Sequence, residues 1–432
     1  MRNPLIEIAL IVGLLAGLGG LVYYKVEAEA EYVAVPDPEP VPQDPPVEQS
    51  LAYSPFSDGL PSKGMWRGNP EVADLNGDGL PDIVCSIRND EGLCVFLGDG
   101  QGGWTKSVEG ISRTLDYGGA DVADFNGDGH VDIVYTTHST PIRVFLGDGT
   151  GGNWKELRDD FLVYDKIVGD VAAGDLNGDG NADIVGIDMF SSKEGRGVMV
   201  FLGDGKGGFS LGADVPLERN KMFGNSVDLG DFDGDGDLDF VASLRNPTVY
   251  LNNGDGTFVI HNEGLPTTTT GGSYLGTAVG DLVPGKGADE IVFAAIVKKD
   301  PKTNEVIQAG LTVWTLDEKG VWQSVSDGLP AADTFYDIDV ADFDGDGKLD
   351  LVTSGFERAT TIFLGDGQGR WEEIGQIEGT EGQRALVKAD DFNGDGMADV
   401  FTLSQYGTGA KVWVREKGKL IRGKSRRSAA PQ

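Results

Sequence analysis

The sequence predicts an all-β fold: a seven-bladed β-propeller of four-stranded antiparallel blades, preceded by one N-terminal transmembrane or signal helix. Three observations in the repeated region predict the propeller. A unit of about 50 residues recurs seven times, each unit carries four short strand patterns joined by Asp-Gly or Gly-Gly turns, and no helical period appears. Four-stranded units at this period are typical of propellers.

Residues 1–30 are predicted to export the rest of the chain. Leu5 to Tyr24 is a 20-residue run with one charge, Glu7, and a helix of that length spans roughly 30 Å, the thickness of a bilayer's hydrocarbon core. Because Arg2 precedes the run and mainly acidic residues follow it, the chain after it is expected outside the cytoplasm. The segment is interpreted as an uncleaved signal anchor. A signal peptide cleaved near residues 28–30, giving a secreted protein, is the alternative.

Residues 31–50 are rich in proline and acidic residues. Such a segment cannot bury a core and extends as a spacer. The propeller is expected to occupy residues 51–423, and a basic disordered tail residues 424–432. The membrane is an expected partner through the N-terminal helix.

The repeat is marked by a nine-residue loop that starts at an aspartate. Asp74 opens DLNGDGLPD, and similar loops open at Asp124, Asp175, Asp231, Asp342 and Asp391. A seventh, altered copy opens at Asp281 as DLVPGKGAD. A fourth strand that begins at an aromatic residue follows in six units: Trp104, Trp154, Phe209, Phe258, Trp322 and Trp371.

The closure of the ring has two candidate strands. Phe56 to Pro61 matches Val325 to Pro330, which follows a fourth strand, so the segment from Leu51 to Ser57 resembles a fourth strand without its own blade. Pairing of this segment with the last blade would close the ring, and the sequence does not decide between it and the second candidate. A strand at Lys419 to Arg422 is the alternative.

The loops have the chemistry of a calcium site. Positions 1, 5 and 9 are Asp in all six intact copies, position 3 is Asn or Asp, and positions 4 and 6 are Gly. Hard carboxylate and amide oxygens at a tight turn favour Ca²⁺. Position 7 varies freely in side chain, as expected of a backbone carbonyl ligand. Position 2 is always Leu or Phe, which suits a residue turned into the core.

About six Ca²⁺ sites are predicted, with the ligands at positions 1, 3, 5, 7 and 9 of each loop. In the first three loops they are Asp74, Asn76, Asp78, Leu80, Asp82, Asp124, Asn126, Asp128, His130, Asp132, Asp175, Asn177, Asp179, Asn181 and Asp183. In the other three they are Asp231, Asp233, Asp235, Asp237, Asp239, Asp342, Asp344, Asp346, Lys348, Asp350, Asp391, Asn393, Asp395, Met397 and Asp399.

The charge of the chain agrees with this interpretation. The formal net charge is −35, which excludes nucleic acid as a probable partner. General solubility and adaptation to high salt are the competing explanations of the acidity. The clustering of the carboxylates in loops favours cation binding, because two like charges 4 Å apart repel by about 4 kcal/mol at an effective dielectric of 20. The loop at Asp281 has Val283 and Gly285 at positions 3 and 5, so no metal is predicted there.

These loops and the VFLGDG turns that follow them resemble the FG-GAP, or VCBS-type, repeats of integrin α-subunit propellers and bacterial surface proteins. The resemblance covers roughly residues 51 to 420. It implies a seven-bladed propeller with Ca²⁺ between the first two strands of a blade, and roles in adhesion or in protein and glycan binding. It also implies that the metal loops lie opposite the ligand-binding face. The second set of Asp-Gly turns is interpreted as hairpin residues: Asp99, Asp148, Asp204, Asp255 and Asp366.

The sequence favours a binding module over an enzyme. Its three histidines, His130, His138 and His261, are not arranged with a nucleophile, and no GxSxG, HExxH or phosphate loop occurs. A propeller enzyme acting on polysaccharide, a lyase or a glycosidase, is the alternative. The expected partner is a protein or a glycan, and blades three to five are the expected partner face because insertions fall there, at residues 188–197, 267–272 and 298–308.

Cys85 and Cys94 fall on adjacent strands of one predicted hairpin. They are interpreted as two semi-buried thiols, and a cross-strand disulfide is the alternative.

Overall fold

The computed structural model describes residues 50–64, 68–87, 92–113, 118–137, 142–157, 168–188, 197–216, 226–243, 247–266, 274–296, 298–299, 306–308, 310–331, 333–405 and 408–416. The chain divides into two units, Met1–Val47 and Glu48–Gln432, and every described strand belongs to the second. The predicted N-terminal helix, nearly all of the predicted linker and the basic tail lie outside the described residues. Within them there is no helix long and apolar enough to cross a membrane.

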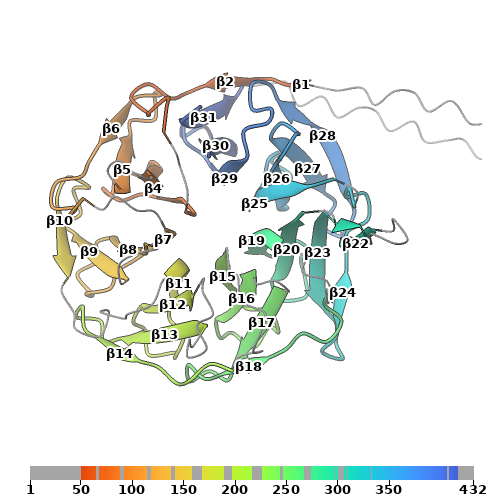
Figure 1. Ribbon diagram of the computed structural model, residues 1–432, viewed down its shortest axis with the longest axis horizontal. Coiled ribbons are helices and arrows are strands. Elements are labelled where there is room, and N and C mark those ends of the chain that lie inside the picture. The colour runs from red at the N-terminus through yellow and green to blue at the C-terminus, as the bar shows by residue number, and fades with distance from the viewer. Residues whose placement is uncertain are drawn as a thin grey trace, which may run out of the picture. The chain divides into compact units, whose positions relative to one another are not determined.

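The described strands form seven radial sheets and one separate two-stranded hairpin. Figure 1 shows the radial sheets around one axis. Each radial sheet contains four antiparallel strands, which follow chain order from the axis outward in six sheets; the outermost strand of the last sheet comes from the N-terminal segment. The predicted all-β, seven-bladed propeller is therefore confirmed.

The first four blades repeat one pattern, in which the strands run in chain order from the innermost to the outermost. They are β3 (Glu71–Ala73), β4 (Asp82–Ile87), β5 (Gly92–Gly98) and β6 (Trp104–Lys106); β7 (Ala120–Ala123), β8 (Asp132–Tyr135), β9 (Arg143–Gly147) and β10 (Trp154–Leu157); β11 (Val168–Gly174), β12 (Asp183–Asp188), β13 (Val198–Gly203) and β14 (Phe209–Leu211); and β15 (Val227–Gly230), β16 (Asp239–Ser243), β17 (Pro247–Asn252) and β18 (Phe258–Ile260).

Blades five to seven keep this order with additions. Their strands are β19 (Tyr274–Gly280), β20 (Glu290–Ala295), β23 (Leu311–Leu316) and β24 (Trp322–Ser324); β25 (Phe335–Ala341), β26 (Asp350–Gly355), β27 (Thr361–Gly365) and β28 (Trp371–Ile377); and β29 (Ala385–Asp390), β30 (Asp399–Ser404) and β31 (Ala410–Arg415). A separate hairpin of β21 (Lys298–Lys299) and β22 (Val306–Gln308) is inserted in blade five between β20 and β23.

An N-terminal strand closes the ring. β2 (Tyr53–Pro55) pairs antiparallel with β31 and supplies the fourth strand of blade seven, with Ser54 opposite Val414. The hydroxyl of Ser57 extends the contact, because it accepts the N–H of Val412 at 2.9 Å and donates to the carbonyl of the same residue at 3.1 Å. Of the two closures left open by the sequence, the structure has the one built from the N-terminal segment. A short strand before it, β1 (Ser50–Leu51), pairs in parallel with β28 of blade six.

The repeated segment after a fourth strand fastens neighbouring blades. In Phe56–Pro61, the carbonyl of Asp58 accepts the backbone N–H of Trp104, and the indole N–H of Trp104 donates to Phe56. Asp327 and Val325 hold Trp371 in the same way. A shared glycine permits the close approach, because a Cβ on Gly59 would lie 2.2 Å from the carbonyl oxygen of Trp104. The sequence match between Phe56–Pro61 and Val325–Pro330 therefore reflects the same contact with the fourth strand of the next blade.

One hydrophobic cluster fills each interface between blades. Every cluster contains the loop residue at position 2, which is at most 2% exposed: Leu75, Phe125, Leu176, Phe232, Leu282, Phe343 and Phe392. The aromatic residue of the next blade's fourth strand packs against it in several cases, as in Phe125 and Phe209, whose ring centroids lie 5.8 Å apart. The core therefore lies between the blades, and each loop is anchored in it.

Cys85 and Cys94 lie directly opposite each other on β4 and β5. Both are buried, and no disulfide joins them. Burial raises the pKa of the Cys85 thiol above its ordinary value. The interpretation as thiols holds, and they are fully buried where partial burial was expected.

We expect that deleting residues 1–57, which removes β1 and β2, lowers the melting temperature by at least about 5 °C, because blade seven loses its outer strand and exposes the edge of β31. Circular dichroism melts of this variant and of one lacking only residues 1–47 measure the effect. Equal melting temperatures for the two variants would show that β2 does not close the ring.

Candidate metal centres

The six intact loops join the first and second strands of six blades. Each begins after the innermost strand, and its position 9 is the first residue of the second strand, as with Asp82 in β4. The loops start at Asp74, Asp124, Asp175, Asp231, Asp342 and Asp391. Because each blade repeats the same strand order, the loops share one face of the ring.

The carboxylate at position 1 organises the loop backbone. In the loop of blade one, Asp74 Oδ1 accepts the N–H groups of Gly77 at 2.7 Å and Asp78 at 3.1 Å, and Oδ2 accepts that of Gly79 at 2.8 Å. Bonds from positions 5 and 6 to position 1 recur in all six loops. The tight turn thus depends on a charged acceptor.

Positions 3 and 5 turn their oxygens toward the same backbone. Asn76 Oδ1 accepts the N–H of Asp78 at 2.8 Å, and Asp78 Oδ1 accepts that of Leu80 at 2.9 Å. Where position 3 is Asp, the acidic side chains gather closely. The oxygens of Asp231, Asp233 and Asp239 lie within 4.8 Å of one another, as do those of Asp342, Asp344 and Asp350.

The position 9 carboxylate is buried and joins three parts of its blade. Asp82 is 0% exposed; its Oδ2 accepts the N–H of Leu75, at position 2, at 3.0 Å, and its Oδ1 accepts that of Gly98, at the end of β5, at 2.9 Å. The equivalent residues in the other loops are at most 1% exposed: Asp132, Asp183, Asp239, Asp350 and Asp399. Burial raises the pKa of Asp82, Asp239, Asp350 and Asp399 to about 7 and that of Asp132 and Asp183 to about 6.

The loop of blade seven has buried oxygens that lack a hydrogen-bond partner. Asn393 Oδ1, at position 3, and Asp399 Oδ2, at position 9, both lack one. Buried oxygens without a partner cost free energy. Since both belong to the predicted ligand set, the residues of this loop fit a bound divalent cation.

The side chains at position 7 pack on the next turn of their blade, and that of Lys348 also donates to a loop carboxylate, Asp346 Oδ2, at 2.8 Å. They lie over the Asp-Gly turn that follows the third strand, so that a Cβ on Gly149 would lie 2.3 Å from His130 Nδ1, and one on Gly205 would lie 2.1 Å from Asn181 Oδ1. Leu80, Asp237 and Lys348 cover Gly100, Gly254 and Gly367 in the same way. At four of these loops the position 7 side chain packs on the neighbouring turn and leaves its backbone to the loop, whereas Lys348 also pairs with the position 5 carboxylate of its own loop.

In the second set of Asp-Gly turns, the aspartate carboxylate accepts hydrogen bonds from the backbone of its own hairpin turn. Asp99 Oδ1 accepts the N–H groups of Gln101 at 2.7 Å and Gly103 at 2.8 Å. Asp148, Asp204, Asp255 and Asp366 accept comparable bonds. These contacts agree with their interpretation as hairpin residues.

The loop of blade five is one residue longer than the nine residues, Asp281 to Asp289, predicted from the sequence. Gly280 pairs with Glu290, as Ala341 pairs with Asp350 in blade six, so Glu290 and not Asp289 is the counterpart of position 9. Glu290 is 0% exposed and its Oε2 accepts the N–H of Val283 at 2.7 Å. Two adjacent acidic residues hid this shift in the sequence.

In this altered loop a lysine is linked to the buried acid through a threonine hydroxyl. Lys286 Nζ donates to Thr315 Oγ1 at 2.9 Å, and Thr315 Oγ1 donates to Glu290 Oε1 at 2.8 Å. The displaced Asp289 reaches the neighbouring loop instead, where its Oδ2 accepts the N–H of Asp231 at 3.1 Å. Blade five thus places its own ammonium group beside the buried carboxylate.

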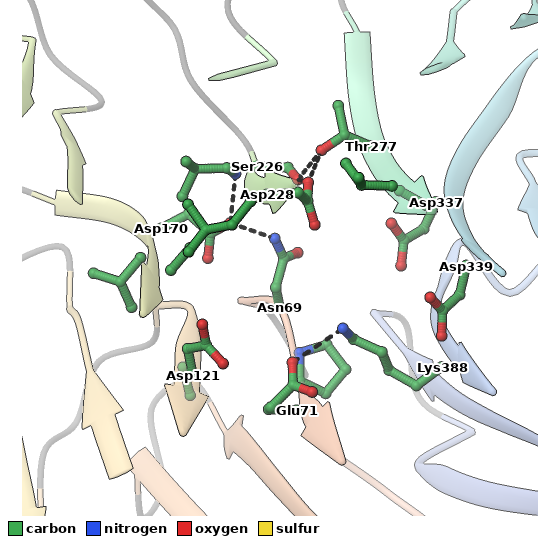
Figure 2. Close-up of a pocket in the computed structure, with 18 of the residues that line it drawn as sticks. Asn69, Glu71, Asp121, Asp170, Ser226, Asp228, Thr277, Asp337, Asp339 and Lys388 are labelled. Atoms are coloured by element: carbon green, nitrogen blue, oxygen red, sulfur yellow. Dashed lines mark hydrogen bonds and ion pairs between the residues drawn. The ribbon is translucent and has the colours of Figure 1, made fainter. Parts of the chain in front are cut away.

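A second acidic site, which the sequence analysis missed, lies on the propeller axis. Figure 2 shows this cavity of about 280 Å³, lined by the innermost strands. Six carboxylates and one ammonium group line it: Glu71, Asp121, Asp170, Asp228, Asp337, Asp339 and Lys388. Five of these seven residues stand three positions before the first Asp of their loop, and that recurrent position is the signal that could have found them.

Several of these carboxylates fasten one innermost strand to the next. Asp121 Oδ2 accepts the N–H of Ala173 in β11 at 2.7 Å, and Asp339 Oδ2 accepts that of Ala389 in β29 at 2.7 Å. Burial raises the pKa of Asp121 and Asp337 to about 7 and that of Asp339 to about 6. The cavity therefore holds carboxyl groups whose charge is costly.

Comparison with known proteins agrees with this geometry. The FG-GAP-like repeat family matches residues 74–135, 124–186, 187–242 and 342–402, which together make up more than half of the chain. No curated protein matches the sequence.

Two crystal structures of BBS1N in complex with ARL6DN, soaked with mercury and with lead, are similar to the chain with TM-scores of 0.54 and 0.53 at 8% identity. Each alignment covers 86% of this chain and 99% of the other. At this identity the likeness concerns the fold alone. From the matched repeats and the seven blades, the chain belongs to the FG-GAP-like repeat family of β-propellers.

Proposed function

We propose that this protein is an extracytoplasmic calcium-binding propeller that acts as a protein- or glycan-binding module in adhesion or scaffolding. The observation that carries the proposal is the set of six loops that gather carboxylate and amide oxygens around one tight turn. The family and the fold agree with a binding or scaffold role.

Calcium is the cation that suits these loops. All predicted ligands are oxygens from positions 1, 3, 5 and 9 and the carbonyl of position 7, and Ca²⁺ accepts 6–8 such ligands in flexible geometry. A bound Ca²⁺ supplies positive charge that holds the loop carboxylates ionised. The loop of blade seven supports this choice most directly, since Asn393 Oδ1 and Asp399 Oδ2 have no other partner.

The loops serve stability in this proposal. Each position 2 side chain lies in an interblade core, and each position 9 carboxylate is bonded to the third strand. Holding the loop therefore holds the junction between two blades. A ligand that binds only the folded state at 100 times its Kd stabilises it by about 2.7 kcal/mol per site.

The opposite face of the propeller is the proposed partner surface. It carries the connections between blades and between second and third strands, including the extra hairpin β21–β22 in blade five. Variable loops on a rigid scaffold are where binding surfaces form. The N-terminal hydrophobic run supports a membrane-anchored location at the cell surface or in the periplasm.

A propeller enzyme acting on polysaccharide is the second candidate, and the acidic cavity on the axis is the observation that favours it, because paired carboxylates can serve as acid and base. Against it, Asp121 and Asp339 are occupied in holding neighbouring strands. We therefore place binding ahead of catalysis.

We predict about six Ca²⁺ per chain, counted by inductively coupled plasma mass spectrometry, and five in the variant Asp344→Ala, which loses one ligand oxygen. Asp344→Asn is the matched control and keeps six, because four loops carry Asn at this position. A chain free of calcium, or equal loss in both variants, would contradict the proposed site.

We predict opposite effects of pH and calcium on stability. The pKa values of the buried carboxyls at position 9 and of Asp121, Asp337 and Asp339 in the cavity lie at about 6 to 7 in the folded state, against about 4 when unfolded. Between these values the folded state holds more protons. The chelated protein therefore loses stability as pH rises from about 4 to 7.

Thermal melts with a chelator should accordingly be several degrees lower at pH 8 than at pH 5.5, and added calcium should raise the melting temperature more at pH 8. Calcium competes with protons for the position 9 carboxylates, which sets this direction. A chelated protein that grows more stable over this interval would show that burial of these groups does not govern its stability.

We predict that the full chain binds a surface protein or polysaccharide without turning it over. Arrays of glycans and reducing-end assays on the same polysaccharides measure the two properties. Deleting residues 298–308 is expected to weaken binding about tenfold or more if blade five forms part of the surface. Product formation that copurifies with the protein would favour the enzyme instead.

A further inference from the structure

The axial cavity is lined by many more carboxyl groups than ammonium groups. Six carboxylates and the single ammonium of Lys388 line a space of about 280 Å³, enough for on the order of nine water molecules. Lys388 is already engaged, because its Nζ lies 3.0 Å from Glu71 Oε2. Five carboxylates remain without an ion-pair partner inside the cavity lining.

The remaining carboxylates form two groups on opposite sides. Figure 2 shows Asp121 and Asp170 at one side and Asp337 and Asp339 at the other. Asp121 lies on β7 beside β11, which carries Asp170, and the other two lie two residues apart on β25. The fifth, Asp228, is satisfied by the hydroxyls of Ser226, at 2.9 Å, and Thr277.

One carboxylate oxygen has no partner. Asp170 is 2% exposed; its Oδ2 accepts Asn69 Nδ2 at 2.6 Å and the N–H of Val227 at 3.0 Å, whereas its Oδ1 has no hydrogen bond. The side chain lines the cavity, and Figure 2 shows its carboxylate directed among the other polar groups. Burial raises the pKa of Asp170, so this buried oxygen is satisfied either by a proton or by a donor from a ligand.

A single dehydrated metal ion does not suit this arrangement. Among the described residues, three acidic oxygens come within 4.8 Å of one another in two of the loops, and no such group is found in the cavity. The lining instead offers two separated acidic pairs across an open space. A slender molecule reaches the lining from solvent, because five of its charged residues are partly exposed: Glu71, Asp121, Asp228, Asp339 and Lys388.

We propose that the axial cavity binds a small organic diamine or polyamine, with one ammonium group between Asp121 and Asp170 and another beside Asp337 and Asp339. Ammonium groups donate up to three hydrogen bonds each and match carboxylates without requiring a compact ligand shell. The alkyl chain between them crosses the cavity. This site is separate from the loops and does not depend on the proposed calcium or partner binding.

Isothermal titration calorimetry on the full chain in a mild detergent tests the proposal, with excess calcium and about 150 mM NaCl to screen surface charge. The probes are cadaverine, with two ammonium groups, pentylamine, with one, and pentanediol, with none. We expect cadaverine to bind about tenfold or more tightly than pentylamine, and pentanediol to give no heat of binding.

The variant Asp170→Asn/Asp337→Asn is expected to lose the preference for cadaverine. Both amides keep an oxygen for the backbone N–H groups of Val227 and Val387, which Asp170 and Asp337 accept now, and a thermal melt checks that the variant folds. Asp204→Asn, in an exposed turn, is the control and should bind as the native chain does. Equal binding of all three probes, or undiminished cadaverine binding by the double variant, would overturn the proposal.

Discussion

The buried carboxylate at position 9 is the contact on which each blade depends. It accepts the N–H of position 2 in five of the intact loops, as with Leu75 and Asp82, and the N–H of a third-strand residue in all six. The side chain of position 2 fills the interface with the next blade. One acidic group therefore couples the loop, the sheet and the packing between sheets.

This coupling gives the acidity of the chain a structural meaning. A buried carboxylate is costly to ionise, which is why the pKa of Asp350 rises to about 7. The carboxylate that accepts the backbone N–H groups is therefore stabilised by binding either a proton or a cation. Solvent-exposed charges such as Asp204 carry no such cost, because the N–H groups of their own turn and water satisfy them. Burial, and not the number of aspartates, decides which of them call for neutralisation.

The sequence was sufficient for the number of blades, the loops and the core position of residues such as Phe232, because these repeat in register every 50 residues or so. It was not sufficient for contacts that depend on closure. The sequence left the choice between the two closing strands open, although Ser57 bonds Val412 across 355 positions. It did not predict the contact of Phe56 and Asp58 with Trp104 of blade one. The cavity carboxylates come from five different blades and meet only when the ring is formed. The shift from Asp289 to Glu290 escaped notice since either acid completes the pattern.

Blade five shows how the same electrostatic demand can be met within the chain. Its loop lacks the acidic residues at positions 3 and 5, yet it keeps a fully buried acid, Glu290. Burial raises the pKa of Glu290, and Lys286, whose ammonium group reaches that acid through Thr315, opposes this rise. A covalently attached cation needs no ligand shell, so the loss of the other oxygens is tolerated. The loop that lacks the ligand set is thus the one whose own lysine is linked to the buried acid, which supports neutralisation as the common requirement of all seven blades.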